Sequence, residues 1–234
     1  MPAATQIQIT LSERITAVAY PAPARSRLPV CLVLAHGAGA NQASAFMVQF
    51  ATTLAERGIG TLTFNFLYSE KGRRIPDRND MLEACYRKVI QAFHDGVFDR
   101  SFEGACLVIG GKSMGGRIAS QVAASDATKI AGLVFLGYPL HPPGRPQQLR
   151  TAHLPAIRAP MLFIQGARDA FGTPEELRPV IQRLKAPAEL CVIEGADHSF
   201  KIPKRAGGSQ AEAYELALKA IELWLRRAVV KQPR

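Results

Sequence analysis

The 234-residue sequence lacks any apolar run long enough to span a membrane. Its longest such stretch, near residues 130–140, is well short of the roughly 20 residues that a membrane-spanning helix needs. The first residues also lack the basic start and apolar core of a signal peptide. We therefore expect a soluble, cytoplasmic protein without a membrane span.

Cysteine is scarce, and no two cysteines form a C-x-x-C pair. The four thiols are those of Cys31, Cys85, Cys106 and Cys191. Three of them fall in strand-like apolar runs, which favours buried free thiols in a reducing compartment over a disulfide framework. We expect neither a metal ion nor a cofactor.

Aromatic residues are also few, at 7% of the chain, and acidic residues are outnumbered by basic ones. The sequence has 29 Lys and Arg against 19 Asp and Glu, a formal net charge of +10. Such a charge can attract nucleic acid, a membrane surface or an anionic substrate. Because the basic residues are mostly dispersed and no binding module is recognisable, we expect a solvated basic surface and no nucleic-acid partner.

Short apolar runs alternate along the chain with amphipathic segments. The runs are typical of strands that are covered on both faces, and the segments between them carry helical stripes such as Phe46, Phe50 and Leu54. This alternation predicts a three-layer α/β sandwich, with a mainly parallel sheet and helices on both faces. The predicted strands are residues 30–35, 62–66, 106–109, 133–136, 161–164 and 190–193.

The N-terminal segment has a different pattern, in which Ile7, Ile9 and Leu11 alternate with polar residues. A second strand-like segment, residues 15–20, follows after a short polar turn. We predict an antiparallel hairpin at one edge of the sheet. Since no composition break or repeat divides the chain, we expect a single domain over residues 1–234.

Ser113 lies in a G-x-S-x-G motif, residues 111–115, directly after an apolar run and before a helical pattern. This context is typical of a nucleophile elbow, a tight turn whose neighbouring positions require small residues. A phosphate-binding loop is the rival interpretation, because Gly111-Lys112-Ser113 matches the end of its motif. That motif needs glycine at position 106, where this chain has Cys106.

Two further polar residues follow later apolar runs. Asp169 comes after residues 161–164, and His198 comes after residues 190–193. The carboxyl ends of parallel strands meet at one edge of a sheet, so we expect Ser113, Asp169 and His198 to lie together there. Glu194 and Asp197 are less well placed to supply the acid.

The residues at these strand ends resemble those of the α/β-hydrolase family over nearly the whole chain. The resemblance rests on His36-Gly37, the Ser113 elbow, Arg168-Asp169 and residues 195–198. It implies that Ser113 is the nucleophile, His198 the general base and Asp169 the residue that orients the histidine. The backbone N–H groups of Met114 and Ala38 would bind the oxyanion.

The connector at residues 141–159 is too short to hold a helical lid. In this respect the chain resembles the small, lidless members of the family that are similar to dienelactone hydrolase. This chain has serine where that enzyme has a cysteine nucleophile. A closer resemblance is to a branch with testis-expressed and chromatin-complex subunits, some of which act as scaffolds. Its marks are residues 36–41, 72–78, 110–116 and 137–140.

These features favour a serine hydrolase that cleaves a carboxylic ester or thioester of a small-molecule acyl substrate through an acyl-serine intermediate. An arginine pair facing the site could hold a carboxylate or phosphate, and the alternative is that these arginines belong to solvent-facing loops. Two alternatives remain, a non-catalytic module that binds an acidic partner and an acyltransferase that uses the same residues. The expected substrate contacts are His36, Gly39, Tyr68, Arg73, Arg74 and Tyr138.

Overall fold

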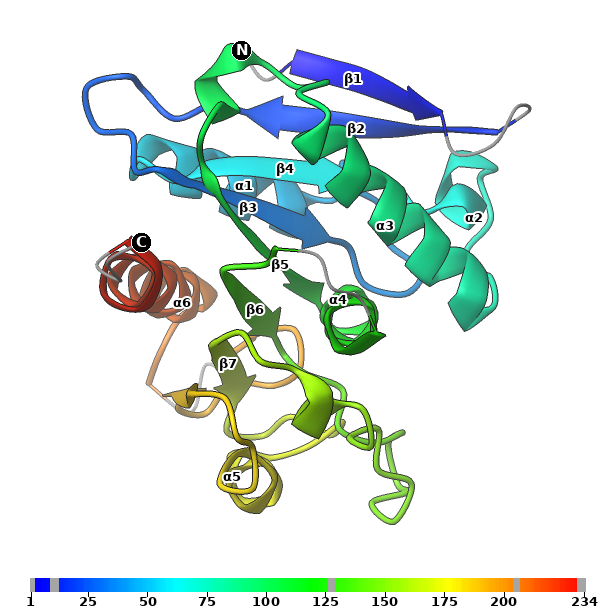
Figure 1. Cartoon of the computed structure of the whole chain (residues 1–234). Coiled ribbons are helices and arrows are strands. Elements are labelled where there is room, and N and C mark those ends of the chain that lie inside the picture. Colours follow the sequence, from blue (N-terminus) through cyan, green and yellow to red (C-terminus); the bar gives the residue numbers. More distant parts are fainter. Residues whose placement is uncertain (1–2, 9–12, 126–128, 204–206, 231–234) are drawn as a thin grey trace.

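An eight-stranded sheet forms the centre of the protein (Figure 1). The structure is a computed structural model and describes residues 3–8, 13–125, 129–203 and 207–230. The strand order across the sheet is β1-β2-β4-β3-β5-β6-β7-β8. The strands are β1 (Ala3–Gln8), β2 (Arg14–Tyr20), β3 (Val30–Ala35), β4 (Gly60–Phe64), β5 (Cys106–Lys112), β6 (Gly132–Leu136), β7 (Met161–Gly166) and β8 (Ala188–Ile193).

The sheet is mainly parallel, as the sequence predicts. Strands β3 to β8 pair with one another in parallel, whereas β1 pairs antiparallel with β2, and β2 antiparallel with β4. The predicted N-terminal hairpin is therefore confirmed at one edge, although Ile9 and Leu11 lie outside the described residues. Strand β4 ends earlier than predicted, because Asn65 and Phe66 leave the ladder and Phe66 precedes a short helix.

Helices cover both faces of the sheet. Figure 1 shows α3 and α4 on one face and α1 and α6 on the other, and the packing of their apolar side chains agrees. The helices are α1 (Ala45–Glu56), α2 (Leu67–Glu70), α3 (Asn79–His94), η1 (Arg100–Phe102), α4 (Met114–Ser125), η2 (Leu154–Ala156), α5 (Pro174–Ile181), α6 (Gln210–Leu225) and η4 (Arg226–Val230). The three-layer α/β architecture is thus confirmed.

Strand β3 shows why both faces need a cover. Cys31, Val33 and Ala35 pack into one apolar core, and the alternate residues Leu32 and Leu34 pack into the other. Successive side chains of a strand point to opposite faces, so a continuous apolar run fills two cores at once. Because both faces of the sheet are covered by apolar packing, polar functional side chains are expected at the carboxyl ends of the strands.

The cysteines are all free, but only two are buried. Cys31 and Cys85 lie in the core, where burial raises the pKa of both thiols. Cys106 and Cys191 are partly exposed, and both pack against the edge of the apolar core that α1 and α6 cover. The prediction of four buried thiols is therefore wrong for these two.

Candidate active site

Ser113 occupies a sharp turn between β5 and α4. Its backbone has φ of 50°, a left-handed conformation that is uncommon for a residue with a side chain. The turn packs so closely on β3 that a Cβ atom at Gly115 would lie 2.3 Å from the Ala35 carbonyl oxygen. This geometry is that of a nucleophile elbow, which presents the serine hydroxyl beyond the carboxyl end of the strand.

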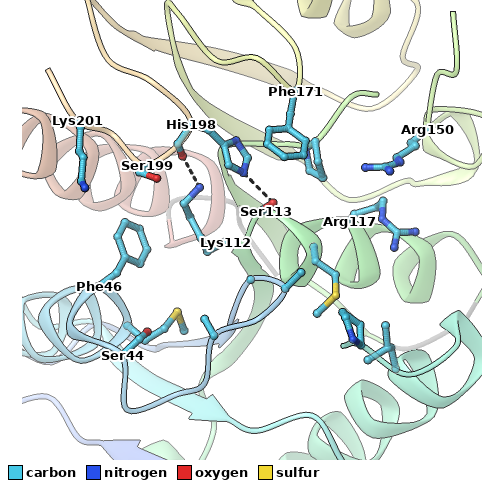
Figure 2. A pocket seen from close by; sticks show the side chains of 18 of the residues that line it. Ser44, Phe46, Lys112, Ser113, Arg117, Arg150, Phe171, His198, Ser199 and Lys201 are labelled. Atoms are coloured by element: carbon cyan, nitrogen blue, oxygen red, sulfur yellow. Dashed lines mark hydrogen bonds between the residues drawn. The ribbon is translucent and has the colours of Figure 1, made fainter. Parts of the chain in front are cut away.

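The three side chains expected at this edge are in hydrogen-bond contact. His198 Nε2 lies 2.8 Å from Ser113 Oγ, and His198 Nδ1 lies 2.7 Å from Asp169 Oδ2. Since a carboxylate only accepts, Nδ1 carries the proton and donates it to Asp169, which leaves Nε2 free to accept from the serine hydroxyl. Figure 2 shows the contact between Ser113 and His198.

Asp169 is held in place by neighbours other than the histidine. Asp169 is only 1% exposed. Gln165 Nε2 donates to its Oδ2 at 2.8 Å, and the Phe171 amide donates to its Oδ1 at 2.8 Å. Asp197, one of the alternatives, accepts instead from backbone amides of its own loop. The buried carboxylate is therefore satisfied and oriented toward the ring of His198.

Lys112, the residue before the serine, holds the loop that carries the histidine. Its Nζ donates to the carbonyl oxygen of His198 at 2.5 Å and lies 5.3 Å from the centre of the Phe200 ring. Burial lowers the pKa of Lys112 to about 8, although the nearby carboxylates of Asp169 and Asp197 partly offset this effect. On the other side, the Phe171 ring packs against the imidazole at 4.2 Å between ring centres.

A cavity of about 580 Å³ opens above Ser113. Ser113, Met114 and Ala38 all line it, as does His198. Met114 is the first residue of α4, and the first amides of a helix have no partner within it, so its N–H is suited to an anion. That Met114 and Ala38 bind an oxyanion stays a prediction.

Three of the predicted substrate contacts lie behind the cavity wall. His36, Tyr68 and Tyr138 are each 0% exposed and do not line the cavity. Burial lowers the pKa of His36 to about 4, and its ring accepts from the Phe66 amide through Nε2. Tyr138 Oη donates to the Arg150 carbonyl at 2.8 Å. These buried side chains hold loops in place and do not line the cavity, which corrects the prediction that they contact the substrate.

The other three predicted contacts, Gly39, Arg73 and Arg74, do not line the cavity either. The Arg73 guanidinium forms an ion pair with Asp77 at 2.5 Å. The carbonyl oxygen of Arg74 lies 3.9 Å from the position that a Cβ atom added to Gly39 would occupy. Gly39 has φ of 72° and serves the turn itself. Neither Arg73 nor Arg74 lines the cavity, and an arginine pair at 73 and 74 that holds an anionic substrate group stays a prediction.

Other residues of the cavity wall were not predicted. Arg117 lies four residues after Ser113, the spacing that places two side chains on one face of a helix, so the sequence contained a signal for it. Arg150 and Phe46 come from segments whose place depends on tertiary structure. Figure 2 shows Arg117 and Arg150 together on one side of Ser113, with Lys112 and Lys201 on the other.

The described residues offer no alternative to this site in the form of a metal centre. They contain no group of three or more histidine, cysteine or acidic side chains placed to hold a metal ion. In the same part of the chain, each helix is too short or too polar to cross a bilayer.

The comparisons with known proteins agree with this geometry. The model of a family described as an alpha/beta hydrolase domain matches residues 29–226, so the chain belongs to that family. A dienelactone hydrolase from Anabaena variabilis is 19% identical, with a TM-score of 0.73 and coverage of 98% of each chain. A lidless α/β serine hydrolase from Xanthomonas campestris is 19% identical, with a TM-score of 0.74 and coverage of 99% of this chain and 97% of its own.

A third similar structure is Est1E from Butyrivibrio proteoclasticus with ferulic acid bound. It is 17% identical, with a TM-score of 0.75 and coverage of 97% of this chain and 100% of its own. At these identities the likeness concerns the fold, and it confirms the resemblance to lidless serine hydrolases similar to dienelactone hydrolase. The closer resemblance to testis-expressed and chromatin-complex subunits stays a prediction.

Proposed function

We propose that the protein is a serine hydrolase that cleaves a carboxylic ester or thioester through an acyl-serine intermediate. The observation that carries this proposal is the chain of contacts from Ser113 through His198 to Asp169, with distances of 2.8 and 2.7 Å. The family and its hydrolase and esterase relatives support the same class of reaction. A scaffold that only binds a partner has no need of these aligned contacts.

The first half of the reaction is the transfer of the acyl group to the enzyme. Ser113 Oγ attacks the carbonyl carbon while His198 Nε2 takes the hydroxyl proton, because an unassisted serine is a weak nucleophile. Asp169 stabilises the imidazolium and stays ionised. The amides of Met114 and Ala38 would bind the oxyanion that forms. The proton on Nε2 then passes to the leaving alcohol or thiol.

The second half of the reaction transfers the acyl group from Ser113 to water, and His198 again acts first as a base and then as an acid. His198 takes a proton from water, and the resulting nucleophile attacks the acyl-serine ester. The intermediate collapses to the carboxylic acid, and Ser113 recovers its proton from the histidine. If an alcohol replaces water, the same residues perform acyl transfer, and the ratio of ester to acid product with added alcohol separates the two outcomes.

A fluorophosphonate probe tests the proposal, because it labels serines that a neighbouring base activates. We expect the native protein to be labelled and Ser113→Ala to be unlabelled. Ser199→Ala is the matched control, since Ser199 also lines the cavity, while His198 Nε2 contacts the hydroxyl of Ser113. Labelling of Ser113→Ala, or no labelling of the native protein, would contradict the proposal and favour the non-catalytic alternative.

A further inference from the structure

Arg117 and Arg150 both line the cavity beside Ser113, and the described residues provide neither with a carboxylate partner. Arg117 donates to two neutral amide oxygens, those of Gln121 and Asn79, each at 3.1 Å. The side chain of Arg150 forms no hydrogen bond or ion pair within the described ranges. Two guanidinium groups thus face one cavity, and neither has a carboxylate in contact among the described residues.

This arrangement is electrostatically unfavourable in the empty cavity. Burial, followed by the charge of Arg150, lowers the pKa of Arg117, and Tyr138 and the more distant Glu83 offset this only in part, so the two cations repel each other in a partly desolvated place. The cavity wall holds four cationic side chains, those of Lys112, Arg117, Arg150 and Lys201. Its one acidic residue, Asp77, is bound to Arg73. A bound anion would relieve the repulsion.

Neighbouring contacts hold the backbone of Arg150 and the guanidinium of Arg117. The Arg150 backbone is anchored twice, by its amide to the Leu140 carbonyl at 2.8 Å and by its carbonyl to Tyr138 Oη at 2.8 Å. Farther along the same connector, His153 Nε2 contacts Ser120 Oγ of α4 at 2.7 Å. The segment that carries Arg150 is therefore fastened to the helix that carries Arg117, which reduces the ordering needed for binding.

We propose that Arg117 and Arg150 bind a carboxylate on the substrate, so that the enzyme acts on esters that also carry a free carboxylate. This inference rests on the proposed function and names its substrate class. Planar guanidinium groups match the geometry of a carboxylate through paired, charge-assisted hydrogen bonds. The lysines lie on the other side of Ser113 (Figure 2), which leaves the arginine side for the carboxylate and the serine for the ester carbonyl.

A matched pair of substrates tests the proposal, 4-nitrophenyl hydrogen adipate and its methyl ester, which differ in one negative charge. We expect kcat/KM to be about 10- to 100-fold higher for the charged ester, the range that charged hydrogen bonds provide. In Arg150→Gln and Arg117→Gln this ratio should fall towards one. Arg145→Gln is the control, because Arg145 lies exposed in the same connector and does not line the cavity.

A second measurement does not depend on any variant. Free adipate should inhibit the native enzyme competitively against the uncharged ester, and more strongly than inorganic phosphate at the same ionic strength. Stronger inhibition by phosphate would overturn the assignment of a carboxylate. So would equal kcat/KM values for both esters in the native enzyme, or a ratio that stays high in both variants. Failure to hydrolyse either ester, with Ser113 unlabelled by the probe, would instead contradict the proposed function.

Discussion

At the scale of single residues, the site depends on how tightly each partner of His198 is held. Asp169 accepts from Gln165 and from the Phe171 amide as well as from the histidine. Its carboxylate therefore cannot rotate without breaking three hydrogen bonds in a buried place, which is costly. The ring of His198 is further confined by Phe171 and by the lysine on its carbonyl. The catalytic geometry is thus present before a substrate arrives.

Asp169→Asn should lower kcat by about 10⁴-fold while the fold is kept. An asparagine amide can donate toward Nδ1, which favours the ring tautomer whose Nε2 carries a proton and cannot accept from Ser113. The measurement is kcat for 4-nitrophenyl acetate. Asp197→Asn is the control, because an amide oxygen can still accept from the Ser199 and Lys201 amides. Equal losses in both variants would show that Asp169 has no special role.

At the scale of elements, the elbow depends on the approach of α4 to β3. The nearest atoms to a Cβ at Gly115 are all backbone, namely Ala35 O at 2.3 Å, Ala35 C at 2.6 Å and His36 O at 2.7 Å. Backbone atoms of a central strand cannot move aside as a flexible side chain can. The small residue therefore sets the distance between the helix and the sheet, and with it the position of Ser113.

Gly115→Ala should destabilise the protein by about 3 kcal/mol or more, because the added methyl group forces α4 away from β3. Gly96→Ala is the matched control. Gly96 has φ of 68° but nothing lies within 4 Å of its Cβ position, so only backbone strain of about 1 kcal/mol is expected there. Urea unfolding of both variants provides the comparison. A smaller loss for Gly115→Ala than for Gly96→Ala would contradict this view of the elbow.

At the scale of the whole molecule, strand order explains which parts of the site the sequence predicts. Ser113, Asp169 and His198 follow β5, β7 and β8, and parallel strands bring their carboxyl ends together, so motif and order suffice. The predicted contacts Tyr68 and Tyr138 also follow strands, but a position after a strand does not determine which way a side chain turns. Arg150 was missed because contacts with distant residues determine the path of its connector.

The stability of the whole molecule should fall as the pH decreases from 6.5 to 4. The buried ring of His36 is neutral, since Nδ1 contacts the Gly37 carbonyl and Nε2 accepts from the Phe66 amide. Burial lowers its pKa from 6.5 to about 4, and that of His153 likewise. Below pH 6.5 the unfolded state binds a proton that the folded state does not, so His36 costs up to about 3 kcal/mol by pH 4, and the more exposed His153 costs less because solvent screens its charge.

Urea unfolding at several pH values, with two histidine variants, measures this effect. His36→Gln should be less stable at neutral pH but should lose less further stability between pH 6.5 and 4 than the native protein. His94→Gln should keep the native pH dependence, because His94 is exposed. An unchanged pH dependence in His36→Gln would show that His36 does not contribute to acid sensitivity.

The most direct test of the central claim is to find the acyl group on Ser113 itself. The native enzyme is mixed with 4-nitrophenyl acetate, quenched in acid during turnover, digested with trypsin and measured by mass spectrometry. Cleavage after Lys112 and Arg117 releases residues 113–117, in which Ser113 is the one hydroxyl side chain. We predict that this peptide carries one acetyl group and that Ser113→Ala has no esterase activity. Native-rate hydrolysis by Ser113→Ala, or an acetyl group on another residue during turnover, would contradict the account.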